Sequence, residues 1–309
     1  MSGGDVQQLG VTIVKRLQNT LLATAVLLLS SAALAQKTQI IEGGAPTGTI
    51  TDGAASFAYN SIGAGGAANA DFTGVGAGDE LFSLWWYFRV SGDAQETPFP
   101  GPDTENYTGA TATLDWADVA SRGFSAQLIN VVADGGGPSG TLTSALTLTN
   151  LGGAPLTLDL FWYVDADVGG SAGGDSAVLT TDPTLITVTD TDTVEVLGGA
   201  NNAYQVLAWP GMRDLLSDGA SDNLDNSGLP FGPGDYTSGM QWAGITIDPA
   251  SSVLIEANLG VNMAAPPPTG GPGGGLPEPA EVPTMNLVGL ILLALVLAAM
   301  TAFTLRRRA

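Results

Sequence analysis

The sequence predicts an all-β protein, a single antiparallel β-sandwich of about ten strands with a membrane-directed segment at each end. Three observations support this class. Several runs alternate apolar and polar residues with a period of two, 43 glycines punctuate the chain, and no internal segment has a convincing helical period. A barrel is the second choice, and the lack of a fixed-period repeat disfavours propellers and solenoids.

The clearest strand is 141–149, where leucines occupy one face and threonines the other. Runs at 156–164 and 253–261 alternate in the same way, whereas 81–90 is apolar on both faces, as in a central strand. The sequence Asn-Leu-Gly-Gly at 150–153 separates two alternating runs and predicts a hairpin turn. Further strands are expected at 56–60, 112–118, 124–131, 185–197, 203–209 and 240–247.

Residues 1–35 have the pattern of a secretory signal peptide. Two basic residues precede an apolar run at 21–29, and small residues follow it. Signal peptidase recognises this order, so the mature chain is expected to begin after an A-x-A site. The cleavage residues are Ala33, Ala35 and Gln36. An uncleaved anchor is the alternative, which the shortness of the apolar run disfavours.

The C-terminus is predicted to cross a membrane. Residues 287–305 contain 19 residues without a charge, and at 1.5 Å per residue a helix of this length spans about 28 Å, close to one bilayer core. Arginines follow at once, and clustered arginines stay on the cytoplasmic side. The preceding domain is therefore expected outside the cytoplasm.

A Pro-Thr motif, a glycine, the apolar span and the arginines together resemble the IPTL-CTERM sorting domain, a bacterial C-terminal signal related to PEP-CTERM. The matching residues are Val282, Pro283, Thr284, Met285, Gly289, Arg306, Arg307 and Arg308. Family members usually read Ile-Pro-Thr-Leu, so the first and last motif residues are conservative departures. The resemblance implies cleavage by an exosortase-type transpeptidase and transfer to the cell surface or extracellular matrix. A plain single-span anchor is the alternative.

The predicted organisation has four parts. A signal peptide (1–35) precedes an acidic passenger domain (36–263), a Pro/Gly-rich stalk (264–281) and the sorting tail (282–309). Proline and glycine at the density found in the stalk do not pack into a core.

Charge and composition exclude several functions. The chain has 30 acidic and 9 basic residues and a net charge of −21, which repels nucleic acid. It has no cysteine and no histidine, which removes disulfides, Ser-His-Asp and Cys-His catalysis and ordinary zinc sites. Carboxylates, hydroxyls and a few arginines remain for chemistry.

The best candidate for a metal site is a Gly-rich loop that follows a predicted strand. Its carboxylates, Asp165, Asp167 and Asp175, are hard oxygen ligands that suit calcium, although the spacing is not that of an EF-hand. An acidic solvated turn is the alternative. A second group is expected to be a long surface loop; it comprises Asp214, Asp218, Asp222, Asn223, Asp225 and Asn226.

Carboxylates beside aromatic residues are also the ingredients of glycoside hydrolysis. The candidates are Asp115 next to Trp116, and Asp159 or Asp165 near Trp162 and Tyr163. Tryptophans stack on sugars as well, but in a sandwich without disulfides most are expected in the core. The six are Trp85, Trp86, Trp116, Trp162, Trp209 and Trp242.

The prediction is an exported envelope or matrix protein with a structural or adhesive role and no cofactor other than calcium. Its partners would be signal peptidase, an exosortase-type transpeptidase, the membrane through its tail, and a glycan or matrix component. The alternatives are a calcium-dependent glycan-binding module and a carboxylate-based polysaccharide hydrolase.

Overall fold

The structure is a computed structural model that describes residues 46–53, 55–60, 69–73, 79–136, 138–180, 185–262 and 265. All of them belong to the first of two compact units, Met1–Gly274. The predicted signal peptide, nearly all of the stalk and the sorting tail lie outside the described residues, so these assignments stay predictions. Within the described part of the chain, no helix is both long and apolar enough to cross a membrane.

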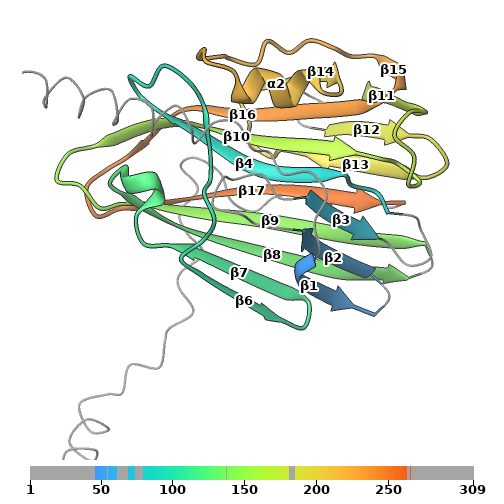
Figure 1. The fold of residues 1–309 in the computed structure, drawn as a ribbon, viewed down its shortest axis with the longest axis horizontal. Coiled ribbons are helices and arrows are strands. Elements are labelled where there is room, and N and C mark those ends of the chain that lie inside the picture. Colours follow the sequence, from blue (N-terminus) through green and yellow to red (C-terminus); the bar gives the residue numbers. More distant parts are fainter. Residues whose placement is uncertain are drawn as a thin grey trace, which may run out of the picture. The chain divides into compact units, whose positions relative to one another are not determined.

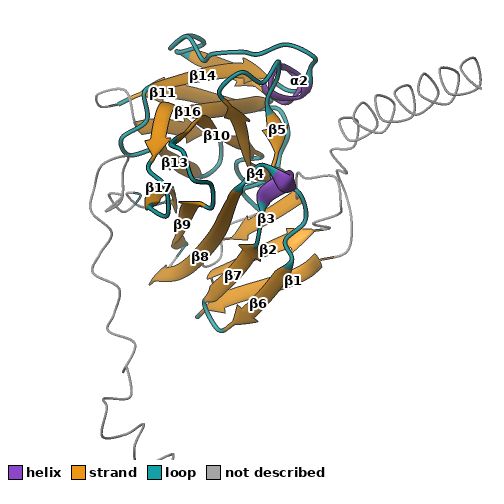
Figure 2. Cartoon of the chain, turned by 90° about the vertical axis from the view of Figure 1, so that its left-hand side faces the viewer, coloured by secondary structure: helices purple, strands orange, loops and turns teal. Residues whose placement is uncertain are grey.

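The described residues form seventeen strands in two sheets (Figures 1 and 2). Sheet A has the order β1 (Pro46–Asp52), β2 (Ala55–Asn60), β3 (Asn69–Thr73), β4 (Ser83–Val90), β10 (Leu156–Ala166), β16 (Tyr236–Ile247) and β14 (Ala203–Ala208), and β5 (Thr97–Pro98) pairs with β4. Sheet B has the order β15 (Phe231–Gly234), β11 (Asp175–Leu179), β12 (Leu185–Thr189), β13 (Thr193–Leu197), β17 (Ser252–Val261), β9 (Ser139–Asn150), β8 (Phe124–Gly136), β7 (Thr111–Trp116) and β6 (Thr104–Thr108). Two short helices are described, η1 (Val119–Ser121) and α2 (Gly211–Ser217).

The two sheets pack face to face. Trp86 Nε1 on β4 donates to Ser144 Oγ on β9 at 3.0 Å, and the ring of Phe88 meets that of Phe124 edge-on at 5.2 Å. Both contacts join sheet A to sheet B across an interior that buries large aromatic side chains. The all-β class with antiparallel sheets is therefore confirmed.

The strand count of about ten is too low. The sequence did not reveal several short strands, among them β3, β5 and β15, because two to five residues carry too little of a periodic pattern. The predicted strand at 185–197 is two strands, β12 and β13, joined by a tight turn in which Asp190 N donates to Asp192 O at 3.1 Å.

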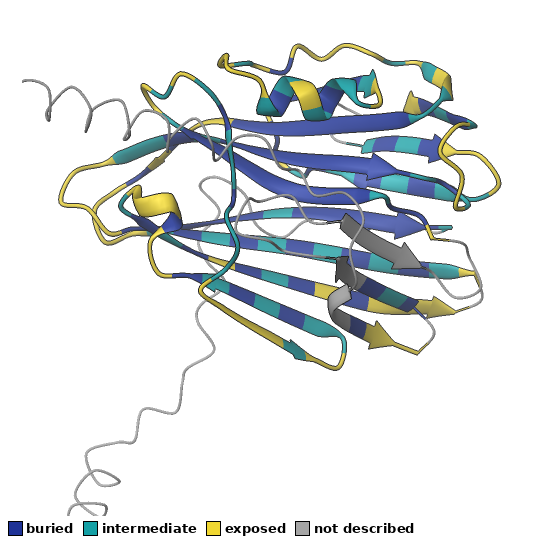
Figure 3. Cartoon of the chain, in the orientation of Figure 1, coloured by how far each residue is buried: buried dark blue, intermediate teal, exposed yellow. Residues whose placement is uncertain are grey.

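Strand β9 follows its predicted alternation closely. Its odd-numbered residues are part-exposed and its even-numbered ones, including Leu142, Leu146 and Leu148, are buried (Figure 3). Strand β10 departs from prediction, because Phe161 and Tyr163, expected on an outer face, are fully buried. Helix α2 and the segment after it cover part of that face, and Met212 and Leu224 pack against Gly239 of β16.

The turn at 150–153 is not a hairpin. Strand β9 lies in sheet B and β10 in sheet A, so this segment carries the chain from one sheet to the other. Asn150 holds the corner: its Nδ2 donates to Ala154 O at 2.8 Å and to Ile247 O at 2.9 Å, and its Oδ1 accepts from Gly152 N at 2.8 Å. These side-chain hydrogen bonds satisfy backbone groups at the crossing, which has no hairpin ladder to pair them.

Candidate functional site

Three carboxylates converge where β10 and β16 meet. Asp165 is a buried residue near the end of β10, Asp167 follows that strand, and Asp235 immediately precedes β16. The antiparallel register pairs Ala166 with Tyr236, so the next step along each strand brings Asp167 and Asp235 together. One oxygen from each of Asp165, Asp167 and Asp235 lies within 4.8 Å of the others. We call these three residues the carboxylate triad.

The carboxylate triad is partly buried. Asp165 is 1% exposed and accepts a hydrogen bond from Tyr163 Oη at 2.9 Å, whereas Asp167 and Asp235 are part-exposed. Burial raises the pKa of Asp167, and the neighbouring charge of Asp235 raises it further. Gathering negative charge in a desolvated place is costly unless protons or a cation neutralise it.

Asp175, the third predicted ligand, lies beside the triad rather than in it. It begins β11, is fully buried, and accepts from Tyr236 N at 3.4 Å. Burial raises its pKa to about 7, against the opposing effect of that hydrogen bond, and the charge of Asp167 adds to the rise. Sequence reasoning missed Asp235, because only the register of β10 against β16 places it at the site.

A cavity of about 230 Å³ opens on the triad. Its lining residues are Phe82, Asp165, Asp167, Ala172, Trp209 and Asp235. Trp209 is 38% exposed, in contrast to the other five tryptophans, which are core residues as predicted. The Arg213 guanidinium lies over the Trp209 ring, 5.0 Å from its centroid. An aromatic wall beside converging carboxylates is suited to a cation, to a sugar, or to both.

A further buried acid supports the loop that carries the triad. Glu80 is fully buried, and its carboxylate accepts from Gly169 N at 2.9 Å while its backbone oxygen accepts from Asp167 N at 3.2 Å. Burial raises the pKa of Glu80 to about 7, and the nearby Asp192 adds to the rise. Glu80 therefore positions Asp167 through the backbone. It precedes β4 without any motif that would have marked it.

Residues of the second predicted oxygen-rich group, at 214–226, form hydrogen bonds that hold the segment against sheet A. Asp214 lies in α2, a helix that the sequence does not predict. Asp222 and Asn223 face Arg89, which donates to Asp222 O and Asn223 Oδ1 at 2.6 Å each. Asn226 Oδ1 accepts from Tyr204 N at 3.0 Å. The segment is thus a loop clamped to sheet A.

The hydrolase candidates are not arranged as a pair of acids in an aromatic cleft. Asp115 accepts from Gln127 on the outer face of sheet B at 2.8 Å, whereas Trp116 is buried on the opposite face. Asp159 is ion-paired with Arg89 and accepts from Gly244 N at 2.7 Å. Trp162 and Tyr163 are fully buried, and only Asp165 reaches the cavity.

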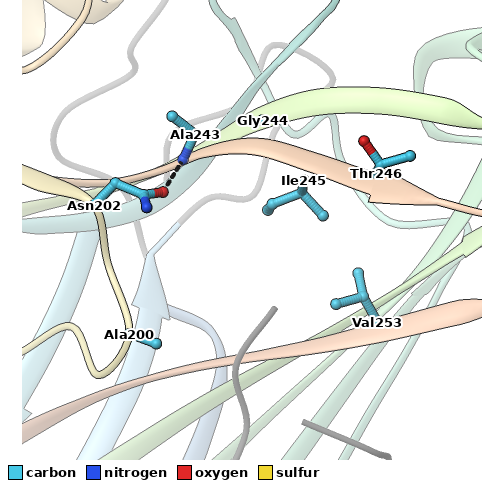
Figure 4. Close-up of a pocket in the computed structure, with 7 residues that line it drawn as sticks. All are labelled: Ala200, Asn202, Ala243, Gly244, Ile245, Thr246 and Val253. Atoms are coloured by element: carbon cyan, nitrogen blue, oxygen red, sulfur yellow. Dashed lines mark hydrogen bonds between the residues drawn. The ribbon is translucent and has the colours of Figure 1, made fainter. Parts of the chain in front are cut away.

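A second hollow, of about 450 Å³, lies beside β16 (Figure 4). Its lining residues are Ala200, Asn202, Ala243, Gly244, Ile245, Thr246 and Val253. Ile245 and Val253 lie across it from one another, and Asn202 Oδ1 accepts from Ala243 N. These residues include no titratable side chain, so the lining of the hollow supplies no acid, base or charged ligand.

Comparisons with known proteins leave the function open. No protein-family model matches the chain, and no curated protein matches it. Among solved structures the chain is similar to a bacterial glucoamylase in complex with acarbose, with 10% identity and a TM-score of 0.49. The similarity covers 71% of this chain and 32% of the glucoamylase chain. Likeness at this level supports no conclusion about activity.

Proposed function

We propose that the chain is an exported cell-envelope or extracellular-matrix protein with a structural or adhesive role, sorted through its IPTL-CTERM-like tail. The observation that supports this role is the outer face of sheet B. On β9, threonines 141, 143, 147 and 149 stand part-exposed in a row. They have polar cross-strand neighbours such as Gln127 and Ser252. A row of part-exposed threonines is suited to polar contact with a matrix.

The test is the intact mass and location of the native protein, tagged within the passenger. A mature species beginning at Gln36, ending near Thr284 and found at the cell surface is expected. A matched variant with Arg306, Arg307 and Arg308 changed to alanine should keep its tail, because the positive cluster orients the span. A wild-type species that retains Arg308 in the inner membrane would contradict sorting and favour a plain anchor.

The carboxylate triad favours a second candidate function, a calcium-dependent glycan-binding module. Asp165, Asp167 and Asp235 would supply oxygen ligands to calcium, whose coordination shell tolerates irregular geometry and accepts further oxygens from water or sugar hydroxyls. Trp209, exposed at the same cavity, would support a sugar ring by stacking.

The test of this second candidate is a calcium titration followed by unfolding. Calcium at a hundred times its dissociation constant should stabilise the fold by about 2.7 kcal/mol. Asp235→Asn should abolish this gain, and Asp248→Asn, an exposed aspartate at the end of β16, should keep it. A glycan panel with wild type and Trp209→Ala then tests the sugar. Equal calcium responses of the two aspartate variants would rule out the triad.

A further inference from the structure

Strand β14 covers only part of the edge of β16. Its ladder reaches Gln241, which pairs with Ala203 and accepts from Asn202 N at 2.7 Å. Asn202 Oδ1 then accepts from Ala243 N, so a side chain takes the place of the next rung. Beyond Ala243, no strand in the described part of the chain pairs with β16 on this side. The edge of sheet A is therefore open from residue 244 to residue 247.

The backbone of Thr246 faces this open edge. Ser91 N donates to Thr157 O at 2.9 Å, so the backbone groups of Thr157 face β4. Such groups alternate in direction along a strand, and the two neighbours of Thr157 therefore face β16, where their partners are Ile245 and Ile247. Thr246, between these partners, turns its N–H and C=O away from β10. It is an exposed residue, and these two groups have no strand partner among the described residues.

The hollow of about 450 Å³ lies directly inside this edge (Figure 4). Ile245 of β16 in sheet A and Val253 of β17 in sheet B lie across it from one another, so the hollow opens between the two sheets. Strand β13 pairs with β17 only from Asn258 onward. Counting described strands alone, both sheets therefore lack a further strand at this corner.

An extended peptide has the geometry that this edge requires. The amides of residues 243 and 244 already donate to side-chain oxygens of Asn202 and Asp159, so an added strand begins its pairing at Thr246. A residue opposite Thr246 in an antiparallel strand exchanges two main-chain hydrogen bonds with it. The residues on either side of that one point their side chains toward the hollow, where apolar groups fit between Ile245 and Val253.

Charge selects among extended peptides. The chain carries a net charge of −21, and Asp248, which is exposed and directly follows β16, flanks the open edge. Like charges across an interface are costly. This disfavours a second copy of the acidic chain and favours a cationic partner, whose approach the field of the protein also accelerates.

We propose that the open edge of β16 binds a cationic, extended segment of another protein by strand addition at Thr246, with apolar side chains of that segment in the hollow. The site shares no residue with the threonine row on β9 or with the carboxylate triad. It therefore adds a protein partner to either of the two proposed functions.

The first test uses the full chain and the synthetic peptide Lys-Lys-Val-Thr-Val-Lys-Lys, whose central threonine is designed to lie opposite Thr246. Fluorescence polarisation of the labelled peptide measures binding. A second peptide carries an N-methyl group on the central threonine, which removes the N–H that donates to Thr246 O and keeps every charge. It should bind about tenfold more weakly. Equal affinities for the two peptides, or no binding of the first at about 1 mM, would overturn the proposal.

Two variants test the same contact from the side of the protein. Thr246→Pro removes the outward N–H, and proline is tolerated at an edge position where this group makes no ladder bond. It should weaken peptide binding about tenfold, whereas Thr246→Val, which keeps the N–H, should bind as the wild type does. Urea unfolding checks that both variants fold. If Thr246→Pro does not fold, the comparison of the two peptides on the wild type still decides.

Filling the hollow tests the second half of the site. Ala200→Trp places an indole at its wall and should weaken peptide binding at least tenfold, whereas Ala133→Trp, at an exposed position on β8, should leave it unchanged. Equal affinities of these two variants would overturn the role of the hollow. Sedimentation of the wild type without peptide tests another occupant: a dimer that Thr246→Pro abolishes would replace the cationic partner with a second copy of the chain.

Discussion

Two clusters of acids in this protein have different surroundings. Around Arg89, the fold supplies its own cation: the guanidinium donates to Glu96 at 2.7 Å, pairs with Asp159, and lies over the ring of Phe161. In the carboxylate triad the acids converge on one another at a cavity whose wall includes Trp209, and the Arg213 guanidinium lies over the ring of Trp209. The first cluster is therefore a structural clamp, whereas in the second burial and the charge of Asp235 raise the pKa of Asp167.

The largest expected effect breaks the clamp. Arg89→Met removes the cation from two partly desolvated carboxylates, and breaking such a buried pair costs about 3–5 kcal/mol. Urea unfolding should record this loss in the free energy of unfolding. The matched control is Arg122→Met, whose exposed pair with Asp93 should contribute about 1 kcal/mol or less. Similar losses in both variants would mean that the Arg89 cluster is no clamp.

The next effect concerns pH. Burial raises the pKa of Glu80 from 4.5 to about 7. Between these values the folded protein holds a proton that the unfolded chain releases, so the free energy of unfolding falls as pH rises through this window. The loss due to Glu80 is about 3 kcal/mol and complete above pH 7.

Glu80→Gln isolates that contribution. In EDTA the variant should be more stable than wild type at pH 8 and similar to it at pH 4, whereas Glu105→Gln, at an exposed position on β6, should follow wild type throughout. Urea unfolding at several pH values measures both. A wild-type protein that gains stability from pH 5 to pH 8 in EDTA would contradict the raised pKa of Glu80.

The smallest effect distinguishes a ligand site from a structural one. Asp167→Asn removes a charge from the triad, so in EDTA it should leave stability unchanged or raise it by about 1 kcal/mol at most. Asp159→Asn weakens the clamp and should lower stability under the same conditions. Differential scanning calorimetry at pH 8 compares them. Loss of stability in Asp167→Asn would make the triad part of the scaffold.

The sequence predicts the long strands well and the site in part. Leucine–threonine alternation on β9 reports a half-buried strand directly, since period-two patterning is a local property. The crossing at Asn150 could not be predicted, because the sequence Asn-Leu-Gly-Gly is equally compatible with a hairpin. Only the pairing of β9 with β17 shows that β9 belongs to sheet B while β10 belongs to sheet A. Asp165 and Asp167 could be predicted because they stand beside glycines in a loop that follows a predicted strand. Asp235 reaches them through the register of distant strands.

The tryptophans of this protein form two optical populations. Trp86 lies 5.9 Å from Trp162 and 5.4 Å from Trp242, ring centroid to centroid, deep between the sheets. Trp209 alone stands at the surface, on the wall of the cavity. A neutral quencher such as acrylamide should therefore extinguish the emission of Trp209 and spare the interior. Without any label, the quenched fraction becomes a direct reading of whether the cavity is occupied.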